Sequence, residues 1–195
     1  MLEEARARLP YLSDEAASPE VRQVFARLRE QWQGAPVLHL YRLIGWAPGL
    51  VGPWLGFARA LRFGVAVSAK LREILIVRSG QLLEAEYEWR HHWVAARDAG
   101  ISEEKLNAVA DWKRSELFDA DERAVLALAD DTATGNGASE PTMRELIRRF
   151  STERVAELVV IAGFYSGVAR IVNSFAVPLE PGFEAMVPRR GDRAS

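Results

Sequence analysis

The apolar residues of this chain recur with the period of an α-helix almost from end to end, and this pattern constrains the fold most. In the stretch 18–33, apolar side chains fall three and four residues apart, as on one face of a helix, at Val21, Val24, Phe25 and Leu28. No convincing alternation of apolar and polar residues with a period of two, the pattern of a strand, occurs along the sequence. The sequence therefore predicts an all-α fold.

Start and stop signals divide the pattern into separate helices. Ser18 and Ser68 can cap helix starts, Pro19 suits a first helical position, and Gly80 and Gly100 are typical of helix ends. The expected helices cover residues 18–33, 37–45, 50–63, 68–79, 84–100, 102–112, 119–134, 139–150 and 152–175.

The length of 195 residues favours one compact domain, which can bury a core without covalent staples. We expect a single domain over residues 1–187, with its core in 15–180. The polar end of the chain, residues 188–195, is expected to be a disordered tail.

Composition excludes several classes of function. A net charge of -2 with only short basic runs indicates no nucleic-acid partner. The absence of cysteine excludes disulfides, thiolate metal sites and thiol-based peroxidase chemistry. The charged start lacks the apolar segment of a signal peptide, and no apolar run approaches the roughly 20 residues that span a membrane. We therefore expect no membrane partner and a cytoplasmic location.

Two segments echo each other. SAKLREILIV (68–77) aligns with TERVAELVVI (152–161), so that Glu73 matches Glu157 within an otherwise apolar block. The alignment predicts a diverged two-fold repeat of helical hairpins. The alternative is that buried helices resemble one another in any case.

The stretch EAEYEWRHHWVAARDAG (84–100) separates two adjacent histidines when its residues are placed at steps of 100°. His92 falls on the apolar stripe with Trp89 and Trp93, and Glu88 lies at its edge, one turn before His92. The opposite side holds the polar residues Glu84, Tyr87, Arg90, His91, Arg97 and Asp98. We therefore predict that His92 is buried and that His91 is solvated.

Glu73 is the exception in LREILIVR, a stretch that is apolar almost all round, as in a buried helix. A buried carboxylate is costly unless it is paired, and the two helices joined at Gly80 should pack antiparallel. We predict that Glu73 pairs with His92, fixing its tautomer and raising its basicity, while Glu88 serves as a second acid or base. The alternative is a satisfied core histidine and a carboxylate that only clamps two helices.

A metal site is the weaker interpretation of these residues. Glu88-x-x-His91 has the spacing of a di-iron motif, but such a site needs a second copy, and His39 has no glutamate three residues before it. A mononuclear site from Glu73, Glu88 and His92 is conceivable. We expect no metal and no other cofactor.

The spacing Glu73-x11-Ala85-x2-Glu88-x3-His92 resembles the motif of the carboxymuconolactone decarboxylase and AhpD-like superfamily. In the AhpD branch, cysteines stand where this chain has Ala85 and Glu88. YEWRHHWVAARDAGIS is similar to a cysteine-free branch, and FDADERAVLALADD and FSTERVAELVVIAGFYSGVARIVNSF are similar to the family's C-terminal half. The resemblance covers roughly residues 15–180.

The resemblance implies an AhpD-like helical bundle that assembles as a homotrimer or homohexamer, with its pocket near a subunit interface. Since the cysteines are absent, peroxide reduction is excluded, whereas the decarboxylase branch needs neither thiol nor cofactor. We therefore expect a cofactor-independent lyase or isomerase that moves protons on a small lactone or carboxylic acid. Glu73, Glu88 and His92 would be its catalytic residues.

Four further residues are candidate contacts for a small-molecule substrate, namely Tyr87, Trp89, Arg170 and His39. Trp89 also fits the core, and Arg170 also fits an ion pair with Glu157. The alternative function is a non-enzymatic small-molecule-binding or assembly protein that keeps the scaffold after losing its cysteines.

Overall fold

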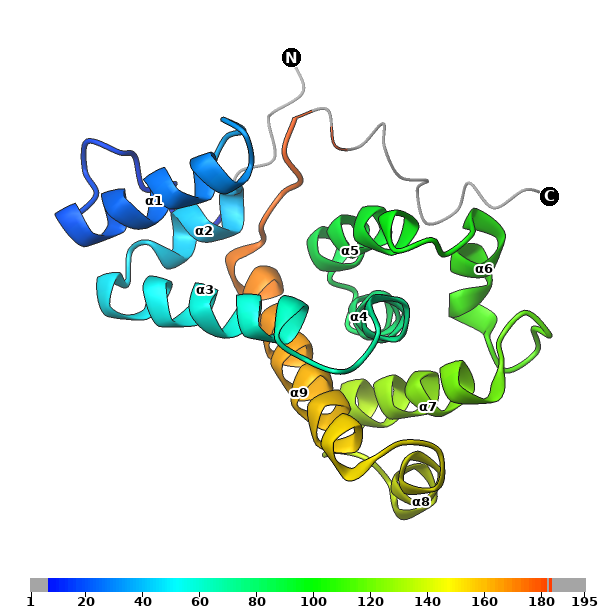
Figure 1. Cartoon of the computed structure of the whole chain (residues 1–195). Coiled ribbons are helices and arrows are strands. Elements are labelled where there is room, and N and C mark those ends of the chain that lie inside the picture. The colour runs from blue at the N-terminus through cyan, green and yellow to red at the C-terminus, as the bar shows by residue number, and fades with distance from the viewer. Residues whose placement is uncertain (1–6, 182, 184–195) are drawn as a thin grey trace.

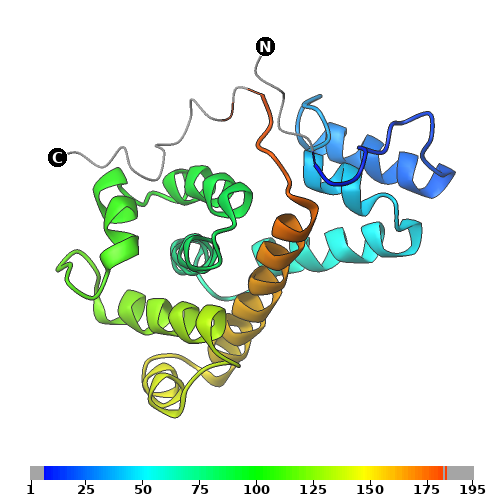
Figure 2. The same ribbon diagram turned by 180° about the vertical axis from the view of Figure 1, so that it is seen from behind.

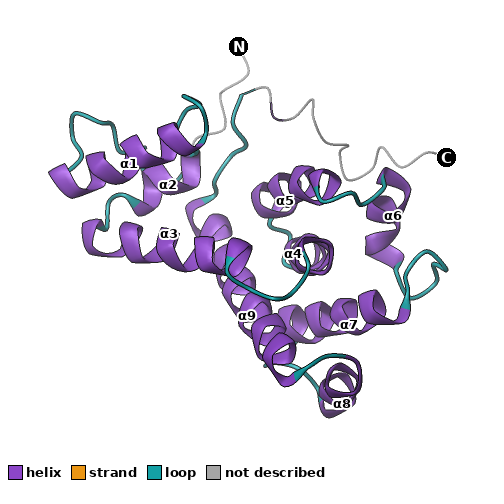
Figure 3. Ribbon diagram, viewed as in Figure 1, coloured by secondary structure: helices purple, strands orange, loops and turns teal. Residues whose placement is uncertain are grey.

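The computed structural model describes residues 7–181 and 183. Throughout these residues the chain forms helices and loops without strands, which confirms the all-α prediction (Figure 3). The elements are α1 (Pro19–Gln31), α2 (His39–Ile44), α3 (Pro48–Phe63), α4 (Ala69–Leu82), α5 (Glu86–Asp98), α6 (Glu103–Ala108), the 3-10 turn η1 (Val109–Asp111), α7 (Ala120–Thr134), α8 (Glu140–Arg149) and α9 (Thr152–Phe175). The predicted tail 188–195 and the domain end at residue 187 lie outside the described residues.

Helix α4 lies in the middle of the molecule, with α5, α7 and α9 around it (Figure 1). The N-terminal helices α1, α2 and α3 form a group on one side. After α9 the chain runs back between this group and α5, which is also seen from behind (Figure 2). This return segment, residues 177–181 and 183, matters for the site described below.

The central place of α4 follows from its composition. Ser68 caps its start by accepting the backbone N–H of Leu71. Four consecutive apolar residues, Ile74 to Val77, are fully buried on all sides of the helix. Each such side chain contributes roughly 1.5–3 kcal/mol when it is fully buried. Because residues 72–77 in the middle of α4 are all buried, Glu73 has no access to water and is expected to pair within the protein.

Gly80 has a different role from the one predicted. Helix α4 does not end there but continues to Leu82, and the turn to α5 includes Glu84 at a φ of 54°. A Cβ atom at position 80 would lie 2.8 Å from the Cβ of Trp89. Gly80 therefore allows α4 and α5 to approach closely, and the close approach brings Glu73 within reach of α5.

The predicted internal repeat is not confirmed. The first copy turns after Leu82, whereas the second continues as the single helix α9 of 24 residues. The aligned glutamates also differ in their contacts, because Glu157 accepts the backbone N–H groups of Ala66 and Val67, each at 2.9 Å. Glu73 has a side-chain partner instead, as shown below.

Helix α9 corrects the prediction that no apolar segment reaches membrane-spanning length. By length and composition it could cross a membrane, with a mean hydropathy of 1.7 over its most apolar window. Half of that window, 50%, is buried inside the fold, and a single helix of this kind is weak evidence for a membrane span. Its buried face packs against α4 and α7.

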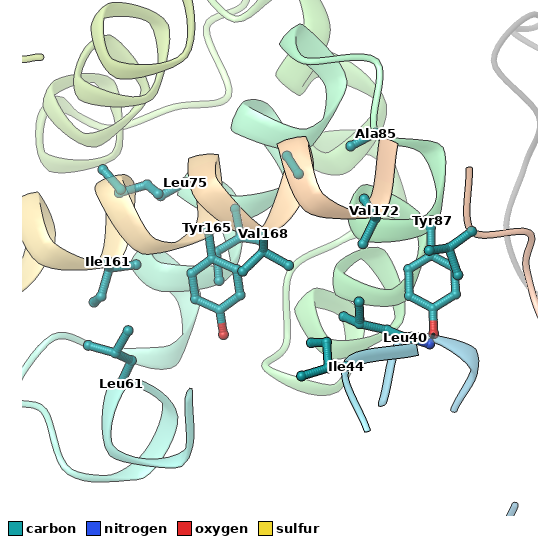
Figure 4. Packing of buried hydrophobic residues seen from close by; sticks show 14 of the residues in the cluster. Leu40, Ile44, Leu61, Leu75, Ala85, Tyr87, Ile161, Tyr165, Val168 and Val172 are labelled. Atoms are coloured by element: carbon teal, nitrogen blue, oxygen red, sulfur yellow. Dashed lines mark hydrogen bonds between the residues drawn. The ribbon is translucent and has the colours of Figure 1, made fainter. Parts of the chain in front are cut away.

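The apolar core has two parts. The larger cluster joins α1, α2 and α3 to α4, α7 and α9, and Figure 4 shows it around Leu61, Leu75 and Ile161. The smaller cluster lies between α4, α5, α6 and α7 and includes Trp89 and Trp93. Helix α5 therefore presents its tryptophans to the smaller cluster, while Tyr87 of the same helix packs in the larger one.

Candidate acid-base site

His92 of α5 lies between two carboxylates. Its Nδ1 is 2.6 Å from Oε2 of Glu73 on α4, and its Nε2 is 3.3 Å from Oε1 of Glu88, one turn earlier on α5. The predicted pairing of Glu73 with His92 is therefore confirmed as geometry, and so is the i,i+4 approach of Glu88. We call these three residues the acid-base triad.

The triad is fixed from the α4 side. Oε1 of Glu73 accepts a hydrogen bond of 3.0 Å from Nε of Arg72, so both oxygens of this carboxylate have a partner. Nη1 of Arg72 in turn donates to the backbone carbonyl of Arg62 at the end of α3, at 2.8 Å. The side chain of Glu73 is 1% exposed and that of His92 is 12% exposed. The imidazole is therefore the more accessible member of the pair.

Charge decides the protonation of this site. Burial by itself would lower the pKa of His92, but Glu73 and then Glu88 outweigh it and raise the pKa to about 9. Burial would likewise raise the pKa of Glu73, but His92 and Arg72 lower it below its ordinary value. At neutral pH the triad therefore contains an imidazolium bonded to an ionised Glu73.

One tyrosine contacts the triad, and a second is coupled to it by charge. The ring of Tyr165 on α9 meets the ring of His92 edge-on, with 4.9 Å between the centroids, and Figure 4 shows its hydroxyl pointing away from α9. Burial and the charge of Glu88 raise the pKa of Tyr165, and the same two causes raise the pKa of Tyr41 on α2 to about 12. Both hydroxyls are therefore protonated at neutral pH and can donate hydrogen bonds.

Tyr165 was missed by the sequence analysis. It stands in an apolar run of α9, and nothing in that run distinguishes a tyrosine at a site from one in the core. Its position beside His92 depends on α9 crossing both α4 and α5.

The other predicted contacts lie elsewhere. Tyr87 and His39 meet at Glu180 in the return segment, which accepts the hydroxyl of Tyr87 and the backbone N–H of His39, each at 2.8 Å. Oε2 of Glu180 is 2.8 Å from Nε2 of His91. We call this group the Glu180 network. Figure 4 shows the hydroxyl of Tyr87 beside the backbone of Leu40, whose N–H it accepts.

The prediction that His91 is solvated is wrong. Its side chain is 17% exposed, and its ring stacks on Phe183 with 4.1 Å between centroids. Tyr87 and Arg90, also assigned to the polar side of α5, are buried as well, and Arg90 bonds to Glu86 at 2.9 Å. The return segment covers part of this side of α5, and a helical projection cannot show what covers a helix.

Trp89 and Arg170 are also placed apart from the triad. Trp89 packs edge-on against Trp93 in the smaller core cluster, with 5.8 Å between centroids. Arg170 is exposed on α9 and donates to the carbonyl of Ser166 at 2.9 Å. It forms no ion pair with Glu157, whose carboxylate binds backbone N–H groups. The roles of Tyr87, His39, Trp89 and Arg170 in substrate binding stay predictions.

The metal alternative gains no support from the geometry. Both ring nitrogens of His92 face carboxylates. Over residues 7–181 and 183, no group of three or more histidine, aspartate or glutamate side chains is arranged to hold a metal ion.

Comparison with known proteins agrees with this architecture. The Carboxymuconolactone decarboxylase family matches residues 48–131, the stretch that contains the triad. Among curated proteins no match is found.

Three solved structures share the fold. An alkylhydroperoxidase AhpD core protein from Ralstonia eutropha JMP134, described as peroxidase-related, has a TM-score of 0.80 at 16% identity, over 96% of this chain and 100% of its own. A variant of the debrominase Bmp8 in complex with 2,3,4-tribromopyrrole has a TM-score of 0.78 at 19% identity, covering 94% and 97%. A peroxidase-related protein from Silicibacter sp. TM1040 has a TM-score of 0.74 at 16% identity, covering 93% and 95%.

The family match and the shared fold complement each other. The first covers the helices that bear Glu73, Glu88 and His92, and the second extends the likeness over nearly the whole chain. Residues 48–131 of this chain therefore match the carboxymuconolactone decarboxylase family, and its fold is that of AhpD-like proteins.

Proposed function

We propose that this protein is a cofactor-independent lyase or isomerase that transfers protons to and from carbon in a small lactone or carboxylic acid. The observation behind this proposal is the bonding of His92 to a carboxylate at each ring nitrogen. Glu73 orients and charges the imidazole through Nδ1, and Glu88 approaches its other nitrogen. General acid and base groups of this kind accelerate reactions by roughly 10²–10⁴-fold.

The proposed lyase reaction balances with these residues alone. The carbon–carbon bond to the substrate carboxylate breaks, carbon dioxide leaves, and the electron pair stays on the substrate as an enolate. The proton on Nε2 of His92 passes through Glu88 to the enolate carbon. Solvent then restores the proton on His92, so the net reaction consumes one proton and releases carbon dioxide.

An isomerase would use the same residues in both directions. Glu88 would take a proton from a carbon next to a carbonyl and become a carboxylic acid, the electron pair of the broken C–H bond would form an enolate, and His92 would keep its own proton. Returning the proton to another carbon completes the reaction. Tyr41 and Tyr165, whose pKa values are raised by burial, would donate hydrogen bonds to the enolate oxygen.

The fold relatives bear on the substrate and on the chemistry. Two of them are described as peroxidase-related. A thiol-based peroxidase step is excluded here because the chain has no cysteine. The debrominase structure contains 2,3,4-tribromopyrrole. A small planar ring is therefore a ligand that this fold can accommodate, which supports a small cyclic substrate.

The second candidate is a non-enzymatic protein that binds a small molecule. The observation that favours it is the full set of partners around Glu73, which would serve equally well to clamp α4 to α5. This candidate predicts that ligands are retained and never turned over.

Assembly and location are also proposals. We expect a homotrimer or homohexamer, in line with the superfamily, and the exposed apolar side chains of Phe57, Phe63 and Val160 support burial between subunits. The cytoplasmic location stays a prediction.

The test uses substitutions that keep the size of each side chain. Carboxymuconolactone and related unsaturated lactones and carboxylic acids are incubated with the enzyme in D₂O, and NMR follows carbon dioxide loss and deuterium uptake at carbon. We expect His92→Gln and Glu88→Gln to lower turnover by about 10²–10⁴-fold. His91→Gln is the matched control and should leave turnover within a few-fold of the wild type.

Two results would contradict the proposal. One is turnover that is unchanged in both His92→Gln and Glu88→Gln, with circular dichroism showing that the variants are folded. The other is an equal loss in the control variant, since His91 belongs to the Glu180 network and not to the triad.

A further inference from the structure

A cavity of about 590 Å³ opens between α1, α2 and α3. Its volume lies in the range of small-molecule sites, roughly 300–1,000 Å³. Two of its lining residues, Tyr41 and Arg62, are also close enough to the triad to take part in its electrostatics, because the charge of Glu88 helps burial to raise the pKa of Tyr41 and the charge of Arg62 opposes that rise. Tyr41 therefore couples the cavity to the acid-base site through charge.

The charge of the lining is of one sign. Arg27, Arg59 and Arg62 line the cavity, and no aspartate or glutamate does. Nε of Arg62 is buried and has no hydrogen-bond partner among the described residues. A buried donor without a partner is destabilising, and a carboxylate is the group that guanidinium donors bind best. The lining therefore suits a ligand with a negative charge.

The walls are aromatic. Trp32 and Tyr41 lie against each other with 5.7 Å between centroids, and both face the cavity. The guanidinium groups of Arg59 and Arg62 lie over the ring of Phe63, which also lines the cavity, at 5.5 and 5.4 Å from its centroid. Aromatic surfaces next to guanidinium groups fit a planar ring that bears a carboxylate.

Two glycines leave room for such a ring. Gly52 and Gly56 stand one turn apart on α3 and line the cavity, and a Cβ atom at either position would meet no atom within 4 Å. Glycine inside a helix is less favourable than alanine. Any larger side chain at these positions would occupy space that a ligand could use.

We infer that this cavity binds a planar organic anion, an aromatic or conjugated carboxylate, with its charge at Arg59 and Arg62 and its ring against Trp32 and Tyr41. The further claim that this ligand is the substrate rests on the proposed function. Binding itself does not, because Trp32, Arg59 and Arg62 have no part in the proton transfer proposed for the triad.

The first test is isothermal titration calorimetry with 2-naphthoate as the probe. We expect 2-naphthoate to bind and 2-naphthalenemethanol, its neutral analogue, to bind at least about tenfold more weakly. Decanoate distinguishes an aromatic site from one for aliphatic anions, and we expect it to bind more weakly than 2-naphthoate. Equal affinity for the neutral alcohol, or no binding of 2-naphthoate, would overturn the inference.

The second test places the probe in this cavity. Arg59→Gln and Arg62→Gln should each weaken binding by about tenfold or more, whereas Arg144→Gln on α8 should have no effect. Gly56→Leu should block the cavity. Gly49→Leu is its control, because Gly49 belongs to the same helix, also has no atom within 4 Å of a Cβ, and does not line the cavity. Equal losses in Gly49→Leu and Gly56→Leu, or no loss in Gly56→Leu, would show that the probe binds elsewhere.

The variant His92→Gln separates this inference from the proposed function. If it binds 2-naphthoate like the wild type and has lost turnover, both stand. If it binds the probe and keeps full turnover, the cavity stands and the acid-base role fails. If the wild type does not bind the probe while turnover depends on His92, the cavity inference fails and the acid-base role stands.

Discussion

Two adjacent histidines of α5 take part in two different networks. His92 is bonded to Glu73 on the neighbouring helix α4, while His91 is bonded to Glu180, which follows 89 residues later in the chain. Both networks combine a glutamate with a histidine and a nearby tyrosine. They differ in where these groups lie and in what else they contact.

In the Glu180 network, the carboxylate is bonded to several groups of the protein itself. The carboxylate accepts a backbone N–H and a tyrosine hydroxyl in addition to its histidine, and together these contacts tie the return segment to α2 and α5. The triad instead holds a charged imidazole and a second carboxylate, and the charge of Glu88 acts on Tyr41, which lines the cavity. The comparison indicates that the same residue types can serve to hold a segment or to handle protons, according to what lies next to them.

The triad and the Glu180 network should differ most in how much each contributes to the free energy of unfolding at pH 7. Glu73→Gln leaves the buried guanidinium of Arg72 and the imidazolium of His92 with one carboxylate fewer, and breaking a buried ion pair costs about 3–5 kcal/mol. Glu180→Gln removes charge from a more exposed site and should cost about 1–3 kcal/mol. Urea unfolding gives both values.

A surface control calibrates this comparison. Glu140 is 82% exposed and pairs with Arg144 on the same helix, so Glu140→Gln should change the free energy of unfolding by less than about 0.5 kcal/mol. If Glu73→Gln lowers the free energy of unfolding by no more than Glu180→Gln does, the ion pairs of Glu73 with Arg72 and His92 stabilise the fold less than their geometry implies.

The next difference concerns pH, and the two networks act in opposite ranges. The pKa of His92 is raised from 6.5 to about 9, so its contribution to stability is fully present below pH 6.5 and is lost as pH rises to 9. The pKa of Glu180 is lowered from 4.5 to about 2, mainly by His91 and the N–H of His39 against the effect of burial. Its contribution is present above pH 4.5 and is lost as pH falls to 2.

Urea unfolding between pH 2 and pH 10 measures both effects. His92→Gln should flatten the alkaline part of the curve, and Glu180→Gln should reduce the acid part without abolishing it, because the pKa of Glu73 is also lowered. An NMR titration in wild type and in Glu73→Gln identifies the group. The His92 midpoint should fall by about one unit or more in that variant. An unmoved His92 midpoint would show that Glu73 does not determine the charge of the imidazole.

The smallest effect is expected at Arg170. Its exposed guanidinium bonds only to the carbonyl of Ser166 among the described contacts, so Arg170→Gln should change stability by less than about 0.5 kcal/mol. Turnover should stay within a few-fold of the wild type. A loss of tenfold or more, measured on any accepted substrate, would restore the role in substrate binding that the sequence suggested.

Several features of this protein could be predicted from the sequence because they are local. Helices can start at Ser18, Ser68 and Ser102 because each serine side chain can accept the backbone N–H three residues later. The structure has these caps. The approach of Glu88 to His92 follows from helical spacing alone. The pairing of Glu73 with His92 required one further step, the antiparallel packing of two consecutive helices.

The remaining features depend on segments that are distant in the sequence. Tyr165 reaches His92 from α9, the cavity lies between α1, α2 and α3, and Glu180 reaches α5 from beyond the last helix. Periodicity gives the direction of a side chain relative to its own helix axis, so the sequence by itself determined the helices and the stripe that contains His92. Only the tertiary structure decided what covers each face, because the burial of His91 depends on which distant segment packs against it.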